Sequence, residues 1–172
     1  MALASRIELL ITDVDGVWTD GGVTLHSDGS ESVTFCVLDG YGVRQIQRAG
    51  LEVVIVSGRK NLPLEHRAKI LDIQELHMGV ADKGPVVEAI LQKRDLSAEA
   101  VAVVGDDLPD LPMFDRCGLC FAPANAVQEV QNRAHYVTQR RGGEGALREI
   151  CDLLLLARRN GGATTPPVST PW

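Results

Sequence analysis

Three short apolar segments, each followed directly by polar residues, constrain the fold of this chain most strongly. They are residues 7–12, 51–56 and 100–104. Continuous apolar runs of this length are typical of strands that are buried on both faces in a parallel sheet. Stretches with helical spacing separate them, among them residues 64–71 and 82–93. The alternation predicts an α/β fold with a doubly wound parallel sheet.

Polar side chains gather where these strands end, which is the edge at which open α/β sheets bind ligands. Together with Lys83, which lies where a predicted helix opens, they are Asp13, Asp15, Ser57, Gly58, Arg59, Asp106, Asp107 and Asp110. Taken singly, each has a structural explanation, such as a solvated turn, a helix cap or a surface lysine. Their recurrence at the ends of three strands predicts one common site.

The spacing of the first two carboxylates points to a metal. Asp13 and Asp15 are two residues apart, so in extended backbone both side chains point to the same side. Two carboxylates this close repel each other unless a cation neutralises them. Oxygen ligands with excess negative charge suit a hard cation, so we predict Mg2+, with Asp106 as a further ligand. The carboxylates expected to support this metal from outside its shell are Asp107 and Asp110.

The same set of groups suits the hydrolysis of a phosphate monoester. A carboxylate nucleophile repels the phosphoryl group unless positive charge and aligned donors surround the phosphate. We predict Asp13 as the nucleophile, because it ends the buried strand, and Asp15 as the acid and base that protonates the leaving alcohol and then activates water. Ser57, the backbone N–H of Gly58 and the charge of Lys83 are expected to hold the phosphate oxygens.

An insert and a tail complete the predicted organisation. Residues 17–37 indicate a β-hairpin, because Asp28-Gly29 lies between stretches rich in Val, Thr and Phe. This insert would overhang the mouth of the crevice and leaves no segment for a separate cap domain. Residues 1–159 are therefore expected to form one domain, and residues 160–172, rich in Gly, Thr and Pro, a flexible C-terminal tail.

Composition narrows the partners and the compartment. The net charge of −6 argues against binding to nucleic acid or to an anionic membrane surface. No segment is long and apolar enough to span a bilayer, and the first residues lack the pattern of a signal peptide, so we expect the cytoplasm. Cys117 and Cys120 form a lone C-x-x-C pair without the further ligands that zinc needs, and we interpret them as small buried residues.

The order of the polar groups resembles the four motifs of the haloacid dehalogenase-like phosphohydrolases, over nearly the whole chain. The resemblance implies a Rossmann-like core with Asp13 as nucleophile and Asp15 as acid and base. It implies that Ser57 and Lys83 bind the phosphate. It also implies that Asp13, Asp106 and the backbone carbonyl of Asp15 bind Mg2+.

Three further segments, residues 15–21, 35–42 and 141–146, resemble a small capless branch of that family. This branch dephosphorylates 3-deoxy-D-manno-octulosonate 8-phosphate and related 2-keto sugar acids. The resemblance implies a small phosphorylated sugar-acid substrate and a role in lipopolysaccharide biosynthesis. It also implies a homotetramer in which the hairpin builds the assembly and a neighbouring subunit closes the active site.

The resemblance extends to substrate contacts. Arg59 and Arg67 match basic positions that this branch uses on its substrate, and Asp39 is expected to contribute there too. Relatives that act on nine-carbon sialic-type acid 9-phosphates also resemble this chain, and some carry an acidic residue in place of Arg59, so the arginine favours the eight-carbon substrate. Trp18 departs from the smaller aliphatic residue that is usual in the branch.

Two other classes of protein share part of the pattern. A phosphorylation-dependent receiver also combines an acidic cluster, a hydroxyl and a lysine on a parallel sheet, but it holds its phosphate whereas an enzyme releases it repeatedly. A non-catalytic module that assembles a larger sugar-nucleotide enzyme is the second alternative. The presence of every expected catalytic side chain argues against it.

Overall fold

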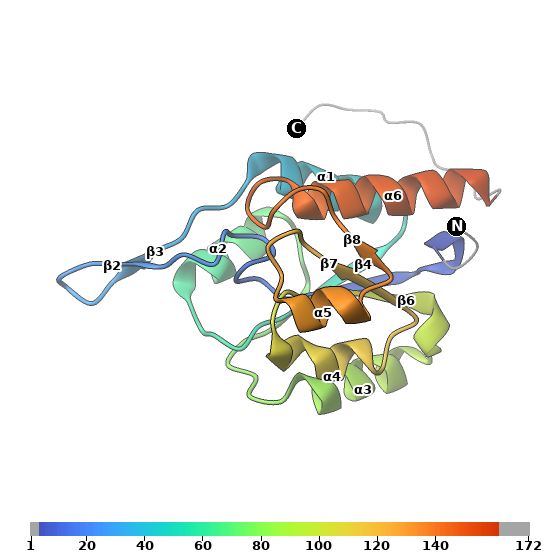
Figure 1. The fold of residues 1–172 in the computed structure, drawn as a ribbon, viewed down its shortest axis with the longest axis horizontal. Coiled ribbons are helices and arrows are strands. Elements are labelled where there is room, and N and C mark those ends of the chain that lie inside the picture. Colours follow the sequence, from blue (N-terminus) through green and yellow to red (C-terminus); the bar gives the residue numbers. More distant parts are fainter. Residues whose placement is uncertain (1–3, 162–172) are drawn as a thin grey trace.

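The computed structural model describes residues 4–161, in which six parallel strands form one central sheet (Figure 1). In chain order the strands are β1 (Leu9–Thr12), β4 (Glu52–Val56), β5 (Glu75–His77), β6 (Val101–Val104), β7 (Leu119–Ala122) and β8 (Tyr136–Val137). Their order across the sheet is β5-β4-β1-β6-β7-β8, so the chain winds outward from β1 in both directions. This topology confirms the predicted doubly wound parallel sheet.

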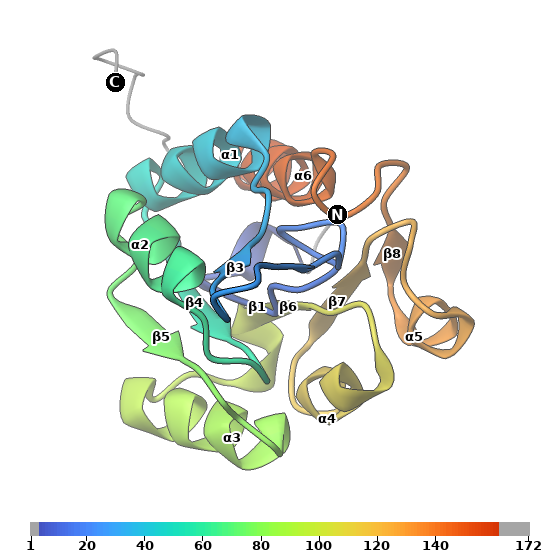
Figure 2. The same ribbon diagram turned by 90° about the vertical axis from the view of Figure 1, so that its left-hand side faces the viewer.

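Helices cover both faces of the sheet (Figure 2). One layer contains α1 (Val37–Arg48), α2 (Leu62–Ile70) and α6 (Ala146–Asn160), and the other contains α3 (Lys83–Arg94), α4 (Leu111–Phe114) and α5 (Gln128–Arg133). Short 3-10 turns lie at Ala4–Arg6, Ala98–Ala100 and Leu108–Asp110. Successive strand residues alternate between the layers: Leu10 packs with the first, and Leu9 and Ile11 pack with the second. Strands buried on both faces explain the continuous apolar runs in the sequence.

The insert between β1 and α1 carries an antiparallel hairpin of β2 (Thr24–Leu25) and β3 (Glu31–Ser32). It projects away from the body of the molecule (Figure 1). The paired strands occupy only part of the predicted insert of residues 17–37. Its first residues form a tight turn instead of a strand, because the backbone N–H groups of Val17 and Trp18 both donate to the carbonyl oxygen of Val14.

Helix α1 begins at Val37, well before Val43, where the helical spacing of residues 43–49 predicts a start. Gly40 and Gly42 precede this predicted start, but both lie inside the helix. A Cβ at Gly40 would come within 2.3 Å of the Arg67 side chain, and one at Gly42 within 3.1 Å of the Arg148 Cα atom. These glycines therefore serve close packing of α1 against its neighbours rather than a break in the helix.

Trp18 lies in the core, with 1% of its surface exposed. Its indole N–H donates to the Thr12 hydroxyl over 3.1 Å, and that hydroxyl donates to the backbone carbonyl of Asp13 over 2.7 Å. Trp18, which departs from the usual residue of the branch, thus helps to hold the end of β1 in place through Thr12.

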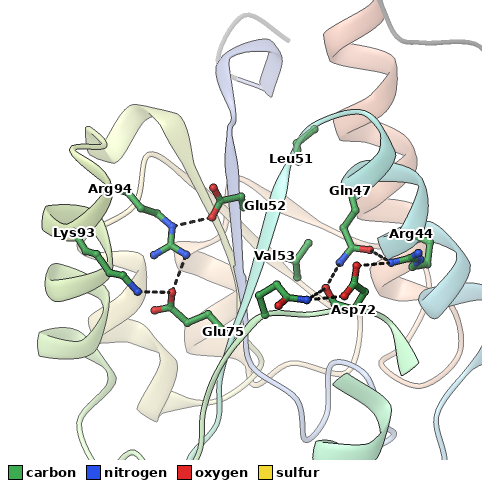
Figure 3. A pocket seen from close by; sticks show the side chains of 10 residues that line it. Arg44, Gln47, Leu51, Glu52, Val53, Asp72, Glu75, Lys93 and Arg94 are labelled. Carbon is green, nitrogen blue, oxygen red and sulfur yellow. Dashed lines mark hydrogen bonds and ion pairs between the residues drawn. The ribbon is translucent and has the colours of Figure 1, made fainter. Parts of the chain in front are cut away.

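The amino ends of β4 and β5 carry a separate polar hollow of about 500 Å3 (Figure 3). Its charges are paired with one another: Glu75 accepts from Arg94 and Lys93, and Arg94 also donates to Glu52. The two carboxylates and the two cations of this cluster thus neutralise one another. It lies at the end of the sheet opposite to the predicted site.

Two further observations concern the helices and the cysteines. None of the helices between residues 4 and 161 combines the length and the apolar character that a membrane crossing requires. All four cysteines are free thiols, and Cys117, Cys120 and Cys151 are buried. Of the predicted tail, residues 162–172 lie outside the described part of the chain.

Candidate active site

The carboxyl ends of β1 and β6 bring the first and last polar groups together. Strand β1 runs directly into Asp13, whose backbone N–H donates to the carbonyl oxygen of Val104 at the end of β6 over 3.0 Å. Asp106 follows β6 two residues later. Its carboxylate lies against Gly16, where a Cβ would come within 2.0 Å of an Asp106 oxygen. Gly16 has a φ of +83°, which favours glycine on conformational grounds as well.

Lys83 forms the centre of a buried charged cluster. As the first residue of α3, it donates from Nζ to Asp13 Oδ1 and to Asp110 Oδ1, each over 2.6 Å. The exposed fractions are 6% for Asp13, 4% for Lys83 and 1% for Asp110. Groups this deeply buried keep their charge only when they are paired. The predicted phosphate-binding lysine and the predicted nucleophile are therefore in direct contact.

The acidic loop after β6 is held by its own last residue. Asp110 Oδ2 accepts from the backbone N–H groups of Asp106 and Asp107 over 2.8 and 3.2 Å. With its other oxygen on Lys83, Asp110 is suited to a supporting role, as predicted. Asp107 is exposed, and its carboxylate accepts from the backbone N–H of Leu108.

Carboxylate oxygens of Asp13, Asp106 and Asp110 all lie within 4.8 Å of one another. Three carboxylates face one ammonium in this cluster, which leaves a net charge of −2 when all are ionised. A divalent cation with a preference for oxygen ligands fits that donor set. The residues present are thus compatible with the predicted Mg2+, although the side chain of Asp15 lies outside this group.

Burial and the close charges shift the pKa values of the groups in this cluster. Burial raises the pKa of Asp13, the charge of Asp110 raises it further, and Lys83 opposes both. Burial, together with the charges of Asp13 and Asp110, raises the pKa of Asp106 to about 8. Burial works against the charge of Lys83, but the two carboxylates outweigh it and raise the pKa of the ammonium. Burial and like charge therefore disfavour the ionised forms of Asp13 and Asp106, and the nearby carboxylates favour the charged form of Lys83.

The predicted acid and base contacts a different group. Asp15 is partly buried, and its Oδ1 accepts from Arg59 Nη1 over 2.8 Å. The other terminal nitrogen of Arg59 donates to Glu31 Oε2 of β3 over 2.5 Å. Arg59 thus links the ends of β1 and β4 to the hairpin.

The predicted phosphate-binding turn follows β4. Ser57 is fully buried, and its hydroxyl oxygen accepts from the backbone N–H of Arg59 over 3.2 Å. Gly58 is exposed, and a Cβ built there would meet nothing closer than the Val80 carbonyl oxygen at 3.7 Å. At Gly58 the turn therefore presents exposed backbone and no side chain.

Two predicted substrate residues lie elsewhere. Asp39 has no exposed surface, and its Oδ1 accepts from the backbone N–H of Arg148 in the first turn of α6 over 2.7 Å. Burial raises the pKa of this carboxyl. Arg67 donates to the Cys36 carbonyl oxygen over 3.2 Å and lies against the Phe35 ring. This arrangement assigns Asp39 to helix packing, and its contact with a substrate stays a prediction that the geometry does not favour.

A set of hydrogen bonds that the sequence did not predict joins Asn125 and the glycine-rich loop after Arg141 to the turn that follows Asp15. Asn125, beyond the end of β7, donates from Nδ2 to the Gly16 carbonyl oxygen over 2.9 Å and accepts at Oδ1 from the Gly142 N–H over 2.6 Å. The Gly143 N–H donates to the Val17 carbonyl oxygen over 3.2 Å. The run of glycines after Arg141 was the sequence signal for these hydrogen bonds, since repeated glycine indicates close approach of two backbones.

Comparisons with known proteins show to which family this chain belongs. The profile of the haloacid dehalogenase-like hydrolases matches residues 72–150. A 3-deoxy-D-manno-octulosonate 8-phosphate phosphatase of Escherichia coli (strain B / BL21-DE3) is 45% identical over 158 residues, which are 92% of this chain and 84% of that protein.

Solved structures extend the likeness to three dimensions. The phosphatase of the same name from Yersinia pestis is 43% identical with a TM-score of 0.89, covering 95% of this chain and 89% of that one. The one from Moraxella catarrhalis, in complex with magnesium, phosphate and KDO, is 34% identical with a TM-score of 0.89, covering 94% and 92%. This chain therefore belongs to the haloacid dehalogenase-like hydrolases, in the branch that contains these octulosonate 8-phosphate phosphatases.

Proposed function

We propose that this protein is a Mg2+-dependent phosphatase whose substrate is 3-deoxy-D-manno-octulosonate 8-phosphate. The observation that carries the proposal is the buried contact of Lys83 with Asp13 and Asp110 at the end of β1, in a chain 45% identical to a phosphatase of that name. This contact places a carboxylate beside a fixed positive charge, as transfer of a phosphoryl group to a carboxylate requires.

The residues divide the reaction into two steps. In the first, an oxygen of Asp13 attacks phosphorus, the bond to the sugar oxygen breaks, and Asp15 gives its proton to that oxygen. In the second, Asp15 takes a proton from water as the water oxygen attacks phosphorus, and the bond to Asp13 breaks. Phosphate leaves and both side chains return to their starting state.

Positive charge lowers the barrier of both steps. Lys83 and the backbone at Ser57 and Gly58 hold the phosphoryl oxygens in this proposal. Asp13, Asp106 and the backbone carbonyl of Asp15 would hold Mg2+, which would supply further positive charge on those oxygens. Asp110 keeps Lys83 and the Asp106 loop in place through the contacts described above.

The proposed substrate is anionic at two points, the phosphate and the carboxylate. Arg59 is partly exposed at the mouth of the site and is the residue proposed to meet the carboxylate. Its positive charge favours the eight-carbon acid over nine-carbon sialic-type acids, some of whose phosphatases carry an acidic residue there. Arg67 stays a proposed substrate contact.

A screen for phosphate release tests this proposal. The panel contains octulosonate 8-phosphate, a nine-carbon sialic-type acid 9-phosphate, and p-nitrophenyl phosphate as a generic monoester. We expect many turnovers on the first compound and a much lower kcat/KM on the other two. A single stoichiometric phosphorylation without release would favour a receiver instead, and no reaction with any compound would favour a non-catalytic module.

We also propose that the enzyme is a homotetramer of the cytoplasm. Free thiols on all four cysteines suit a reducing compartment. The support for assembly is apolar surface on and beside the hairpin: exposed fractions reach 75% for Leu25, 67% for Val37 and 66% for Leu62. Light scattering tests this half of the proposal, and a monomer at working concentration would contradict it.

The tail is proposed to contact a neighbouring active site. Deletion of residues 160–172 should leave assembly intact but raise KM or lower turnover, since water exclusion at the site would be lost. Unchanged kinetics of the truncated enzyme would argue against this role.

A further inference from the structure

The Arg59 guanidinium lies between two carboxylates from different parts of the chain. Its Nη1 contacts Asp15 Oδ1 over 2.8 Å, and its Nη2 contacts Glu31 Oε2 over 2.5 Å. The exposed side-chain fractions are 37% for Arg59, 24% for Asp15 and 21% for Glu31. The bridge therefore sits at the border between the interior of the site and solvent.

The position of Glu31 makes this bridge more than a surface ion pair. Glu31 belongs to β3, which pairs with β2 in a sheet of its own and not with the central sheet. Partly exposed ion pairs contribute little to folding stability, because solvent screens them and two long side chains lose freedom. A contribution to stability alone therefore does not account for a hairpin residue that reaches the predicted acid and base through one arginine.

Geometry gives Glu31 a distinct task. An arginine side chain has many rotamers, and a single partner leaves it free to turn about that contact. A planar guanidinium with a partner on each terminal nitrogen is held in one plane and at one distance from the acidic cluster. Glu31 is thus the second anchor that fixes where Arg59 can meet an incoming anion.

We propose that Glu31 is a positioning residue, which holds the Arg59 guanidinium in place for the carboxylate of the sugar-acid substrate. The hairpin then takes part in substrate selection, because the side chain that orients Arg59 comes from it. This inference rests on the proposed function, since it assumes a substrate with a carboxylate. A phosphate monoester without a carboxylate does not use this contact.

The test compares Glu31→Gln with the wild type on two substrates. For octulosonate 8-phosphate we expect KM to rise about fivefold to tenfold, as for a weakened charge-assisted contact, with kcat within twofold. For p-nitrophenyl phosphate we expect unchanged kcat and KM. The matched control is Ser32→Ala, which removes the neighbouring side-chain hydrogen bond to His26 within the hairpin. It should leave kcat and KM unchanged for both substrates. Thermal unfolding and light scattering establish that each variant is folded and assembled.

A double-mutant cycle with Arg59→Ala shows whether Glu31 acts through the arginine. In the Arg59→Ala background, Glu31→Gln should add no further increase in KM. An independent increase there, an equal loss on p-nitrophenyl phosphate, or a lower KM in the single variant would each overturn the inference. If the wild type itself does not hydrolyse octulosonate 8-phosphate, the proposed function fails. If the wild type is active and Glu31→Gln is indistinguishable from it, the inference alone fails.

Discussion

Replacement of Gly142 by alanine tests how closely the glycine-rich loop must pack against the turn at Gly16, which follows Asp15. A Cβ at this position would lie 1.8 Å from the Gly16 carbonyl oxygen, 2.5 Å from the Gly16 carbonyl carbon and 2.8 Å from the Thr19 carbonyl oxygen. Real Cβ atoms essentially never come closer than 3.0 Å to another heavy atom. The two backbones must therefore separate by at least 1.2 Å, the difference between 3.0 and 1.8 Å.

This separation falls on a part of the molecule that cannot absorb it freely. It strains or breaks the bond of Asn125 to Gly142 and displaces Gly16, which lies directly after Asp15 and against Asp106. A displacement of about 1 Å in a catalytic group costs on the order of a hundredfold in rate. Overpacking of this kind also destabilises the fold by about 1–3 kcal/mol.

We therefore expect Gly142→Ala to reduce kcat on octulosonate 8-phosphate about a hundredfold while the protein still folds. Steady-state kinetics and urea unfolding measure the two effects separately. Gly50→Ala is the matched control. Gly50 has a φ of +85° at the end of α1, and a Cβ there meets nothing within 4 Å, so the variant should lose stability through backbone strain but keep its kcat. A Gly142→Ala enzyme with kcat within threefold of the wild type would refute this reasoning.

The charged groups give three further predictions. Lys83→Met should lower kcat about a hundredfold to a thousandfold, because the phosphoryl group and two buried carboxylates lose their nearest positive charge. Kinetics at saturating Mg2+ measure this loss, and a loss under tenfold would contradict the assignment. EDTA should abolish activity and Mg2+ should restore it. The apparent affinity for Mg2+ should rise with pH up to about pH 8, since Asp106 must lose its proton to bind metal. Restoration by zinc alone, or an affinity independent of pH, would count against the site. Contacts with Arg94, His77 and Lys93 outweigh burial and lower the pKa of Glu75 from 4.5 to about 2. A lowered pKa contributes stability above pH 4.5 that is lost as pH falls toward 2, so the stability difference between the wild type and Glu75→Gln, measured by urea unfolding, should shrink over that range and not above it.

Local sequence pattern was sufficient for the sheet and for the residues at its carboxyl edge. Apolar runs end within a residue or two of the observed strands because burial on both faces leaves no other pattern for them. Parallel strands share one carboxyl edge, so Asp13, Asp106 and Lys83 could be expected to meet although they are distant along the chain.

Contacts across long sequence separations were beyond that reasoning. Asn125 reaches Gly16 across 109 residues, and nothing in its local sequence indicates the partner. Glu31 contacts Arg59 across 28 residues, and the pattern of the hairpin does not indicate this partner. The start of α1 was misplaced because glycine is ambiguous: it either ends a helix or permits close helix packing, and here Gly40 and Gly42 do the latter.

The most direct test of this account asks whether phosphate passes through Asp13. In an Asp15→Asn variant, protonation of a sugar leaving group and activation of water are both lost while the nucleophile remains. The nitrophenolate of p-nitrophenyl phosphate leaves without protonation, so a phosphoenzyme should accumulate when this compound and Mg2+ are added. Acid quenching, proteolysis and peptide mass spectrometry should locate one phosphoryl group on Asp13, and Asp13→Asn should show neither this adduct nor turnover. Phosphorylation of another residue, or near-normal turnover by Asp13→Asn, would contradict the account.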